Sequence, residues 1–317
     1  MGALFIAGNG FDIAHGIPTT YGDFRNYVID QYPEALTLRN EVVYLNDLLD
    51  IDPIAFSAEI LLNAMDKAAG ENWSNFEEAL ATISFNAKLP KPNHEESETE
   101  EEDHELMSQY LLYMDMLTSD FIKCSSYWQI LFSKWIRSIQ DKIEKHQFLP
   151  KENLKALLSN NDMLFFTFNY TKTLQELYGI SKITHIHNRV GQKLIFGHGN
   201  EKATYGQGVH MSSEDINITS SFLDDMIGSF QKDTISPLKK YRNFFRKLDH
   251  NVNKVYSYGF SYGSVDSVYI KRIVERIAPD TTWFFTEYES KDTEALRIKK
   301  IKLRRYGFKG KFGLFQG

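Results

Sequence analysis

The first nineteen residues constrain the fold more than any other part of the chain. A short apolar run at residues 2–7 leads directly into a Gly-x-Gly turn formed by Gly8, Asn9 and Gly10. An apolar run of this length bounded by glycine is typical of a buried parallel strand. Glycines in the turn permit positive φ and let another group approach the backbone closely. We therefore expect a Rossmann-type strand, turn and helix whose N-terminus suits a phosphate, or, alternatively, glycines that serve packing alone.

Strand-like and helix-like segments alternate through the second half of the chain. Apolar strand-type runs lie at residues 163–168, 183–187, 194–196, 252–258 and 282–285, and helical spacing lies at 171–178 and about 265–277. This alternation predicts an α/β fold with a Rossmann-like parallel sheet and helices on both faces. Residues 21–85 and 106–148 instead have mostly helical spacing. We expect a nucleotide-binding layer built from residues 1–20 and 160–317, with a large helical insertion at 21–159.

Charge is distributed unevenly along the chain. The formal net charge is −6, but residues 95–105 carry eight acids and no base, so the remainder is +2 (−6 plus 8). Such a run predicts a mobile acidic surface loop at about 90–105. Residues 297–311 carry eight Lys or Arg and no acid. Apolar residues between these charges favour a half-buried helix followed by a strand with a solvated basic face, and contact with nucleic acid is the alternative.

Several classes of protein are excluded by composition. No stretch reaches 18 consecutive apolar residues, which excludes an obvious membrane span, and the N-terminal apolar run is too short for a signal peptide. The single cysteine, Cys124, excludes an intramolecular disulfide and a Cys-rich zinc site. We expect a cytoplasmic protein.

Polar residues follow the apolar strands at four points: the Gly8 turn and residues 167–170, 185–188 and 259–266. Active sites of parallel sheets gather at the carboxyl ends of strands, so we expect these residues at one edge. Asn169 offers an amide that can hold a water or a ribose hydroxyl, and His187 offers an imidazole that can accept a proton. These two are the candidate catalytic residues, although His187 could instead be a structural histidine that bonds a carbonyl.

Other interpretations of the same residues stay open. A His-x-His pair of His185 and His187, together with His198 and a carboxylate such as Glu77 or Asp266, is an alternative zinc or manganese site. Asp266 could simply cap a helix that begins near Val265. A serine hydrolase that uses Ser261 is improbable, because no histidine follows His250.

The Gly spacing is similar to the first motif of the sirtuin-like NAD-binding fold, with Gly8, Gly10, Gly16, Ile17 and Pro18 in register. Later segments extend this resemblance: Asn169-Tyr170-Thr171, His187-Asn188, and Gly259-Phe260-Ser261 with Asp266. Two positions depart from the sirtuin-like pattern, since Thr171 stands in place of an Asp and Asn188 in place of a Gly. Both departures weigh against NAD cleavage more than against the fold.

The chain resembles the AbiH family of phage abortive-infection proteins more closely. The matching segments are Asn9, Phe11 and Asp12 with His15-Gly16, then residues 73–80, 168–171, 185–187 and 196–200. The resemblances imply antiphage defence and an NAD or related nucleotide as ligand or substrate, without a metal. They place the ligand at Gly8, Asn9, Gly10, Phe11, Asp12, Gly16, Tyr170, Gly259, Ser261 and Asp266.

NAD hydrolysis on infection is the leading hypothesis for function. The alternatives are a nucleotide-sensing interaction module without turnover and a metal-dependent nuclease. The resemblance also implies a phage trigger or partner protein, with a homo-oligomer as a further expectation.

Overall fold

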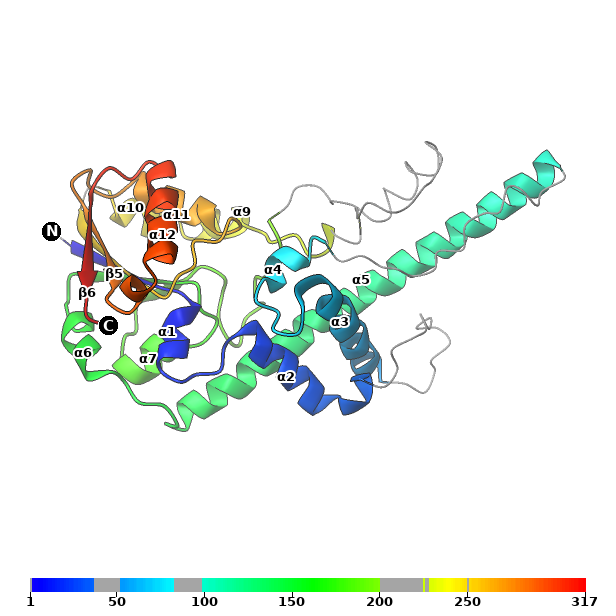
Figure 1. Ribbon diagram of the computed structural model, residues 1–317, viewed down its shortest axis with the longest axis horizontal. Helices are drawn as coiled ribbons and strands as arrows, with labels where there is room; N and C mark the ends of the chain where they lie inside the picture. The colour runs from blue at the N-terminus through cyan, green and yellow to red at the C-terminus, as the bar shows by residue number, and fades with distance from the viewer. Residues whose placement is uncertain (1, 37–51, 83–98, 200–224, 226–227, 250) are drawn as a thin grey trace. The chain divides into compact units, whose positions relative to one another are not determined.

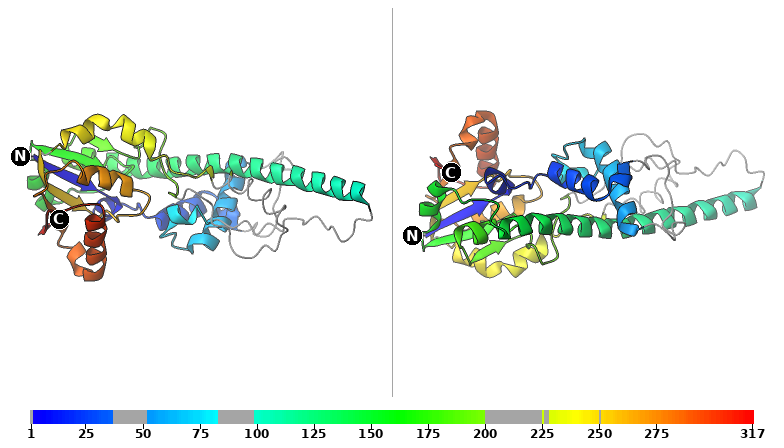
Figure 2. Two further views of the ribbon diagram at one scale, coloured as in Figure 1. Left: turned by 90° about the horizontal axis from the view of Figure 1, so that it is seen from above. Right: turned by 90° about the horizontal axis from the view of Figure 1, so that it is seen from below.

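A six-stranded, all-parallel sheet organises the fold (Figure 1). The structure is a computed structural model that describes residues 2–36, 52–82, 99–199, 225, 228–249 and 251–317. The strand order is β3-β2-β1-β4-β5-β6. The strands are β1 (Gly2–Ala7), β2 (Met163–Thr167), β3 (Ile183–His185), β4 (Val252–Tyr258), β5 (Thr282–Thr286) and β6 (Lys311–Phe315). The predicted Rossmann-like α/β class is thereby confirmed (Figure 2).

Alternate residues of the strands face two separate apolar cores, as the two-residue repeat of a strand requires. Leu4, Ile6 and Phe166 face a core completed by α10 (Arg242–Lys247), α11 (Ser267–Val274) and α12 (Thr293–Arg305). Phe5 and Phe165 face a core completed by α1 (Asn9–Ala14), α6 (Glu152–Leu158) and α7 (Thr173–Tyr178). Helices therefore cover both faces of the sheet (Figure 1).

The chain forms two compact units. The first, which contains the sheet, comprises Met1–Asp23, Ser133–Phe196 and Lys232–Gly317, and the second comprises Phe24–Phe132 and Gly197–Gln231. The long helix α5 (Glu100–Glu144) contributes residues to both. The remaining helical elements are α2 (Tyr21–Gln31), η1 (Pro33–Leu36), α3 (Pro53–Ala69), α4 (Phe76–Ala79), α9 (Ile235–Lys240) and η3 (Glu289–Lys291).

These units divide the chain at other places than the expected boundaries. Residues 133–159 belong with the sheet, because α6 packs Leu154 and Leu158 into its core and Gln140 accepts a hydrogen bond from the Lys172 N–H. Residues 197–231 belong with the second unit, where Phe230 stacks on Trp128 at 4.8 Å.

Two local predictions need correction. Residues 194–196, expected as a strand, lie outside every strand of the described chain, and Ile195 instead donates its N–H to the His187 carbonyl. The acidic run was expected as a loop, but Glu100–Glu105 form the first turns of α5 because helical hydrogen bonding continues through them. The rest of that predicted loop, up to residue 98, lies outside the described residues. No described helix is long and apolar enough to cross a membrane.

The second unit is built on an aromatic core. Phe24 contacts Trp73 and Phe132 edge to face, with ring centroids 5.8 Å and 5.2 Å apart. The Trp73 indole donates to Asp66, which also forms an ion pair with Arg25 at 2.7 Å. The aromatics of this segment are core residues, in agreement with their helical spacing.

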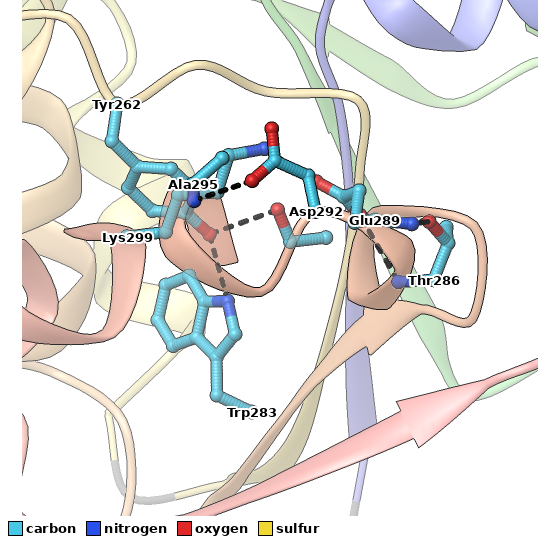
Figure 3. Close-up of polar contacts among 8 residues, drawn as sticks. Tyr262, Trp283, Thr286, Glu289, Asp292, Ala295 and Lys299 are labelled. Atoms are coloured by element: carbon cyan, nitrogen blue, oxygen red, sulfur yellow. Dashed lines mark hydrogen bonds and ion pairs between the residues drawn. The ribbon is translucent and has the colours of Figure 1, made fainter. Parts of the chain in front are cut away.

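Polar contacts join the start of the C-terminal helix α12 to the end of β5 and to the loop after β4 (Figure 3). Asp292 caps α12 by accepting the Ala295 N–H at 2.9 Å, and Glu289 accepts from Lys299 at 2.6 Å. The buried Tyr262 hydroxyl accepts the Trp283 indole N–H at 2.9 Å. The basic segment is thus a half-buried helix followed by a strand, as its apolar spacing predicted.

Candidate functional site

The turn between β1 and α1 is locked against the loop that follows β4. Gly8 donates its N–H to the Tyr258 carbonyl at 3.0 Å, and Gly10 donates to the Gly259 carbonyl at 2.9 Å. A Cβ on Gly10 would lie 2.6 Å from the Gly259 Cα, and Gly259 itself has a φ of +62°. Only glycine permits this approach of two backbones, so the packing alternative holds for these three residues.

The expected phosphate site at this turn stays a prediction, and the backbone N–H groups of its two glycines are not free to serve it. The Gly8 and Gly10 N–H groups are already used, and the Phe11 N–H donates to the Gly8 carbonyl at 2.9 Å. The space that Cβ atoms would fill holds backbone of the β4 loop.

A first polar cluster lies beneath α1, inside the core formed with α7. Asp12 is 1% exposed, and its carboxylate accepts a hydrogen bond from the Thr171 hydroxyl at 2.5 Å. The side chains of Thr173 and Asn169 also bond to it. Burial raises the pKa of Asp12 to about 6, although these hydrogen bonds oppose the rise. Ionisation of the Asp12 carboxyl in this cluster is therefore energetically unfavourable.

His185 completes this cluster as a neutral side chain. Its Nδ1 lies 3.1 Å from the Asn169 carbonyl oxygen and its Nε2 lies 2.7 Å from Gln175 Nε2. A carbonyl can only accept, so Nδ1 carries the proton and Nε2 accepts from the amide. Burial lowers the pKa of His185 to about 4. With both ring nitrogens engaged, His185 is a structural residue in this arrangement.

A second polar cluster joins three segments of the first unit. His187 Nε2 lies 3.0 Å from Asp266 Oδ1, and Lys232 Nζ lies 3.1 Å from the same oxygen. The His187 and Lys232 side chains are buried. Burial raises the pKa of Asp266, but the charge of Lys232 and the neighbouring His187 outweigh it and hold that pKa below its usual range. Asp266 is therefore an ionised carboxylate.

The contacts of this cluster bear on the helix-cap interpretation of Asp266. Asp266 occupies the N-cap position of α11, yet its side chain makes no capping hydrogen bond, so the helix-cap interpretation is wrong. The carboxylate accepts from His187 Nε2–H instead, which leaves the lone pair of a neutral His187 on Nδ1.

The two candidate catalytic residues lie in different clusters. Asn169 belongs with Asp12, whereas His187 contacts the rings of Phe168 and Tyr269 beside Asp266. Both follow neighbouring strands at the carboxyl edge, as predicted. Lys232, Thr173 and Gln175 were missed, because no local spacing distinguishes them from ordinary surface or helix residues.

The predicted ligand residues differ in accessibility. Asn9, Gly16 and Ser261 are exposed, whereas Gly8, Phe11 and Asp12 are buried. Gly10, Tyr170, Gly259 and Asp266 are intermediate. The Asn9 amide donates to the Thr19 carbonyl at 2.8 Å, and the Tyr170 hydroxyl donates to the Ile195 carbonyl at 3.0 Å.

The histidine-based metal site does not assemble in the part of the chain that the structure describes. Within those ranges, no three His, Cys, Asp or Glu side chains gather as a metal would require. His185 uses both nitrogens in hydrogen bonds, and His187 lies beyond the end of β3 with its own carboxylate partner. Glu77 belongs to the second unit, as does His198, whose N–H donates to Phe230.

The comparisons with known proteins give one family. A family model described as Bacteriophage abortive infection AbiH matches residues 4–287, nearly the whole chain. No curated protein and no solved structure matches the chain.

Proposed function

The chain belongs to the bacteriophage abortive infection AbiH family, and from that premise we propose that it binds NAD at the carboxyl edge of its sheet and hydrolyses it on infection. Hydrolysis would add water across the bond between ribose and nicotinamide, giving ADP-ribose, nicotinamide and a proton. Loss of NAD would stop the metabolism on which phage replication depends.

The observation that carries this proposal is the pair of His187 and Asp266. The carboxylate fixes the imidazole with Nε2–H toward it, at 3.0 Å, and so directs the basic Nδ1 away from Asp266. A base oriented by a carboxylate is the arrangement that general-base catalysis uses. In the proposed reaction His187 Nδ1 takes the proton from the attacking water or from a ribose hydroxyl.

Asn169 would act beside this base because it follows β2, which neighbours the strand before His187. The two side chains would not need to share a hydrogen bond. Its side chain bonds to Asp12, which fixes the orientation of the amide at the end of β2. An amide can orient a hydroxyl without competing for the proton. Asn169 would therefore position the ribose while His187 moves the proton.

In this proposal the glycine turn acts through packing, and its glycines make no direct contact with the nucleotide. Gly8, Gly10 and Gly259 set the distance between the β1 and β4 turns, and Phe11 and Asp12 pack beneath them. Direct contacts with the nucleotide would come from exposed or half-exposed neighbours, namely Asn9, Gly16, Tyr170 and Ser261.

The basic C-terminal segment supports a nucleic-acid partner less well. Arg297 pairs with Glu294 at 2.7 Å and Lys299 pairs with Glu289 at 2.6 Å. Lys302 and Arg304 donate to the backbone carbonyls of Tyr262 and Phe308. Lys300 also lies over the Phe312 ring at 5.7 Å, so at least five of the eight basic residues have partners within the chain. A phage component as trigger and self-association on activation are further parts of the proposal.

Two measurements test the proposal together. Calorimetry measures the binding of NAD, and assays of extracts from infected cells measure the release of nicotinamide. We expect millimolar or tighter NAD binding by the wild type and by His187→Ala. His187→Ala should release nicotinamide about 100-fold more slowly or worse, since a general base contributes about 10²–10⁴-fold. Asp266→Asn should show an intermediate loss.

His146→Asn is the matched control, because His146 is exposed and has a φ of +56° that asparagine tolerates. Its binding and turnover should equal those of the wild type. Absence of NAD binding would reject the nucleotide proposal altogether. Binding without nicotinamide release would favour the sensing module.

A further inference from the structure

Three buried oxygen atoms beneath α1 have no hydrogen-bond partner. They are Asp12 Oδ1, Asn169 Oδ1 and Gln175 Oε1. All three residues line one narrow pocket, together with Phe11, Thr167, Thr171, Thr173, Leu174 and His185. Buried polar atoms are hydrogen-bonded with few exceptions, so three unpaired acceptors around one space require an explanation.

The orientation of both amides follows from their partners. His185 Nδ1–H donates to the Asn169 carbonyl, so His185 Nε2 must accept from the Gln175 amide, and Gln175 Oε1 is the atom left over. Asn169 donates its side-chain N–H to the Asp12 carboxylate, which can only accept, and Asn169 Oδ1 is left over in turn. Rotating either amide would break these bonds. The pocket atoms that lack any partner are therefore all acceptors.

The charge of Asp12 has no basic counterpart within this cluster. The groups that bond to the carboxylate are Thr171, Thr173 and Asn169, all neutral. An uncompensated buried carboxylate is strongly unfavourable, and such a group either takes up a proton or pairs with a cation.

We propose that this pocket binds a sodium ion, held by Asp12, Asn169 and Gln175. Oxygen-only ligands select hard cations and disfavour zinc, which prefers nitrogen and sulfur. One positive charge matches the single carboxylate. Three side-chain oxygens and one charge disfavour magnesium, which keeps several waters, and calcium, which takes six to eight oxygens.

This site goes beyond the proposed function and does not depend on it. It also differs from the zinc or manganese site considered from the sequence, since it uses oxygen ligands and none of the histidines as a ligand. Its ligands come from α1, from the end of β2 and from α7. A bound ion would tie these three elements together and would hold the Asn169 amide in place.

Thermal unfolding of the full chain in sodium, potassium and choline chloride tests the proposal. The salts are compared at equal ionic strength and at about pH 8, where the Asp12 carboxyl is ionised. We expect the midpoint of the wild type to be at least about 2 °C higher in sodium than in choline, because a ligand of the native state stabilises it. Potassium should give a smaller increment.

Two variants and a control assign the effect to the pocket. Asp12→Asn removes the charge, and Gln175→Met removes one ligand from a half-buried position, so one remains informative if the other fails to fold. Each should lose at least half of the sodium increment. Asp280→Asn, at an exposed carboxylate, should keep all of it.

Equal midpoints in sodium and choline would overturn the proposal, and so would an increment that persists in both pocket variants. An equal response to potassium would overturn the assignment to sodium. No nucleotide is present in any arm, so failure here is distinguishable from failure of the NAD proposal.

Discussion

Asp12 shows at the scale of a single residue what the sequence could and could not predict. Its place just after a Gly-x-Gly turn marked it as unusual, because a carboxylate has little packing reason to follow a buried strand. Its contacts come from Thr171 and Asn169, about 160 positions away in the chain. Local spacing cannot reveal that pairing, since it depends on how α7 packs over α1. The sequence therefore identified Asp12 as a candidate and predicted that it contacts a nucleotide. It did not predict the buried polar cluster in which Asp12 lies.

Asp12 also predicts how stability depends on pH. Its pKa rises from 3.8 to about 6 in the folded state, so the folded state holds the proton more tightly than the unfolded state. The stabilisation is complete below about pH 4 and is lost as pH rises through about 6. This difference corresponds to about 3 kcal/mol.

Chemical denaturation of the wild type and Asp12→Asn from pH 4 to 8, in choline chloride, measures this pH-dependent loss of the free energy of unfolding. The wild type should lose about 2.4 kcal/mol relative to the variant across that range, since part of the full difference is already lost at pH 4. His185, in the same pocket and with a pKa of about 4, titrates in both proteins and cancels in the difference. Parallel pH profiles of the two proteins would contradict the assignment.

At the scale of elements, the strands were predicted well because each is a short apolar run between turn residues. The predicted run at 252–258 coincides with β4, and the runs at 163–168 and 282–285 differ from β2 and β5 by one residue. The exception, 194–196, has the same apolar character without a neighbouring strand to pair with. Strand formation depends on that partner, which the local sequence does not encode.

The contact between the β1 and β4 turns gives a prediction at this scale. Gly10→Ala should lower the free energy of unfolding by about 1–3 kcal/mol, because the added methyl group would meet the Gly259 backbone and force the two turns apart. Urea denaturation measures the change.

Gly228→Ala is the matched control, since a Cβ there meets no atom within 4 Å and its φ is not in the left-handed region. It should leave stability unchanged or slightly raise it. A Gly10→Ala protein as stable as the wild type would show that these turns do not pack as described.

At the scale of the whole molecule, the α/β layer was predicted from both ends of the chain, and the AbiH membership from motifs that span most of it. The limits of the compact units were not predicted, because α5 has one continuous helical pattern while its residues divide between two units. No local signal marks that change of packing partner. Kinship with the sirtuin-like fold and the use of NAD remain predictions, since they rest on short motifs with two departures.

The most direct test of the account is NAD content during phage infection of cells that carry the wild type, Asn169→Ala, His187→Ala or the control His146→Asn. NAD should fall, and protection should hold, in the wild type and the control alone. The double variant should be scarcely worse than either single one, because groups that act as a unit are not additive. Stable NAD in protected wild-type cells, or full protection by His187→Ala, would contradict the central claim.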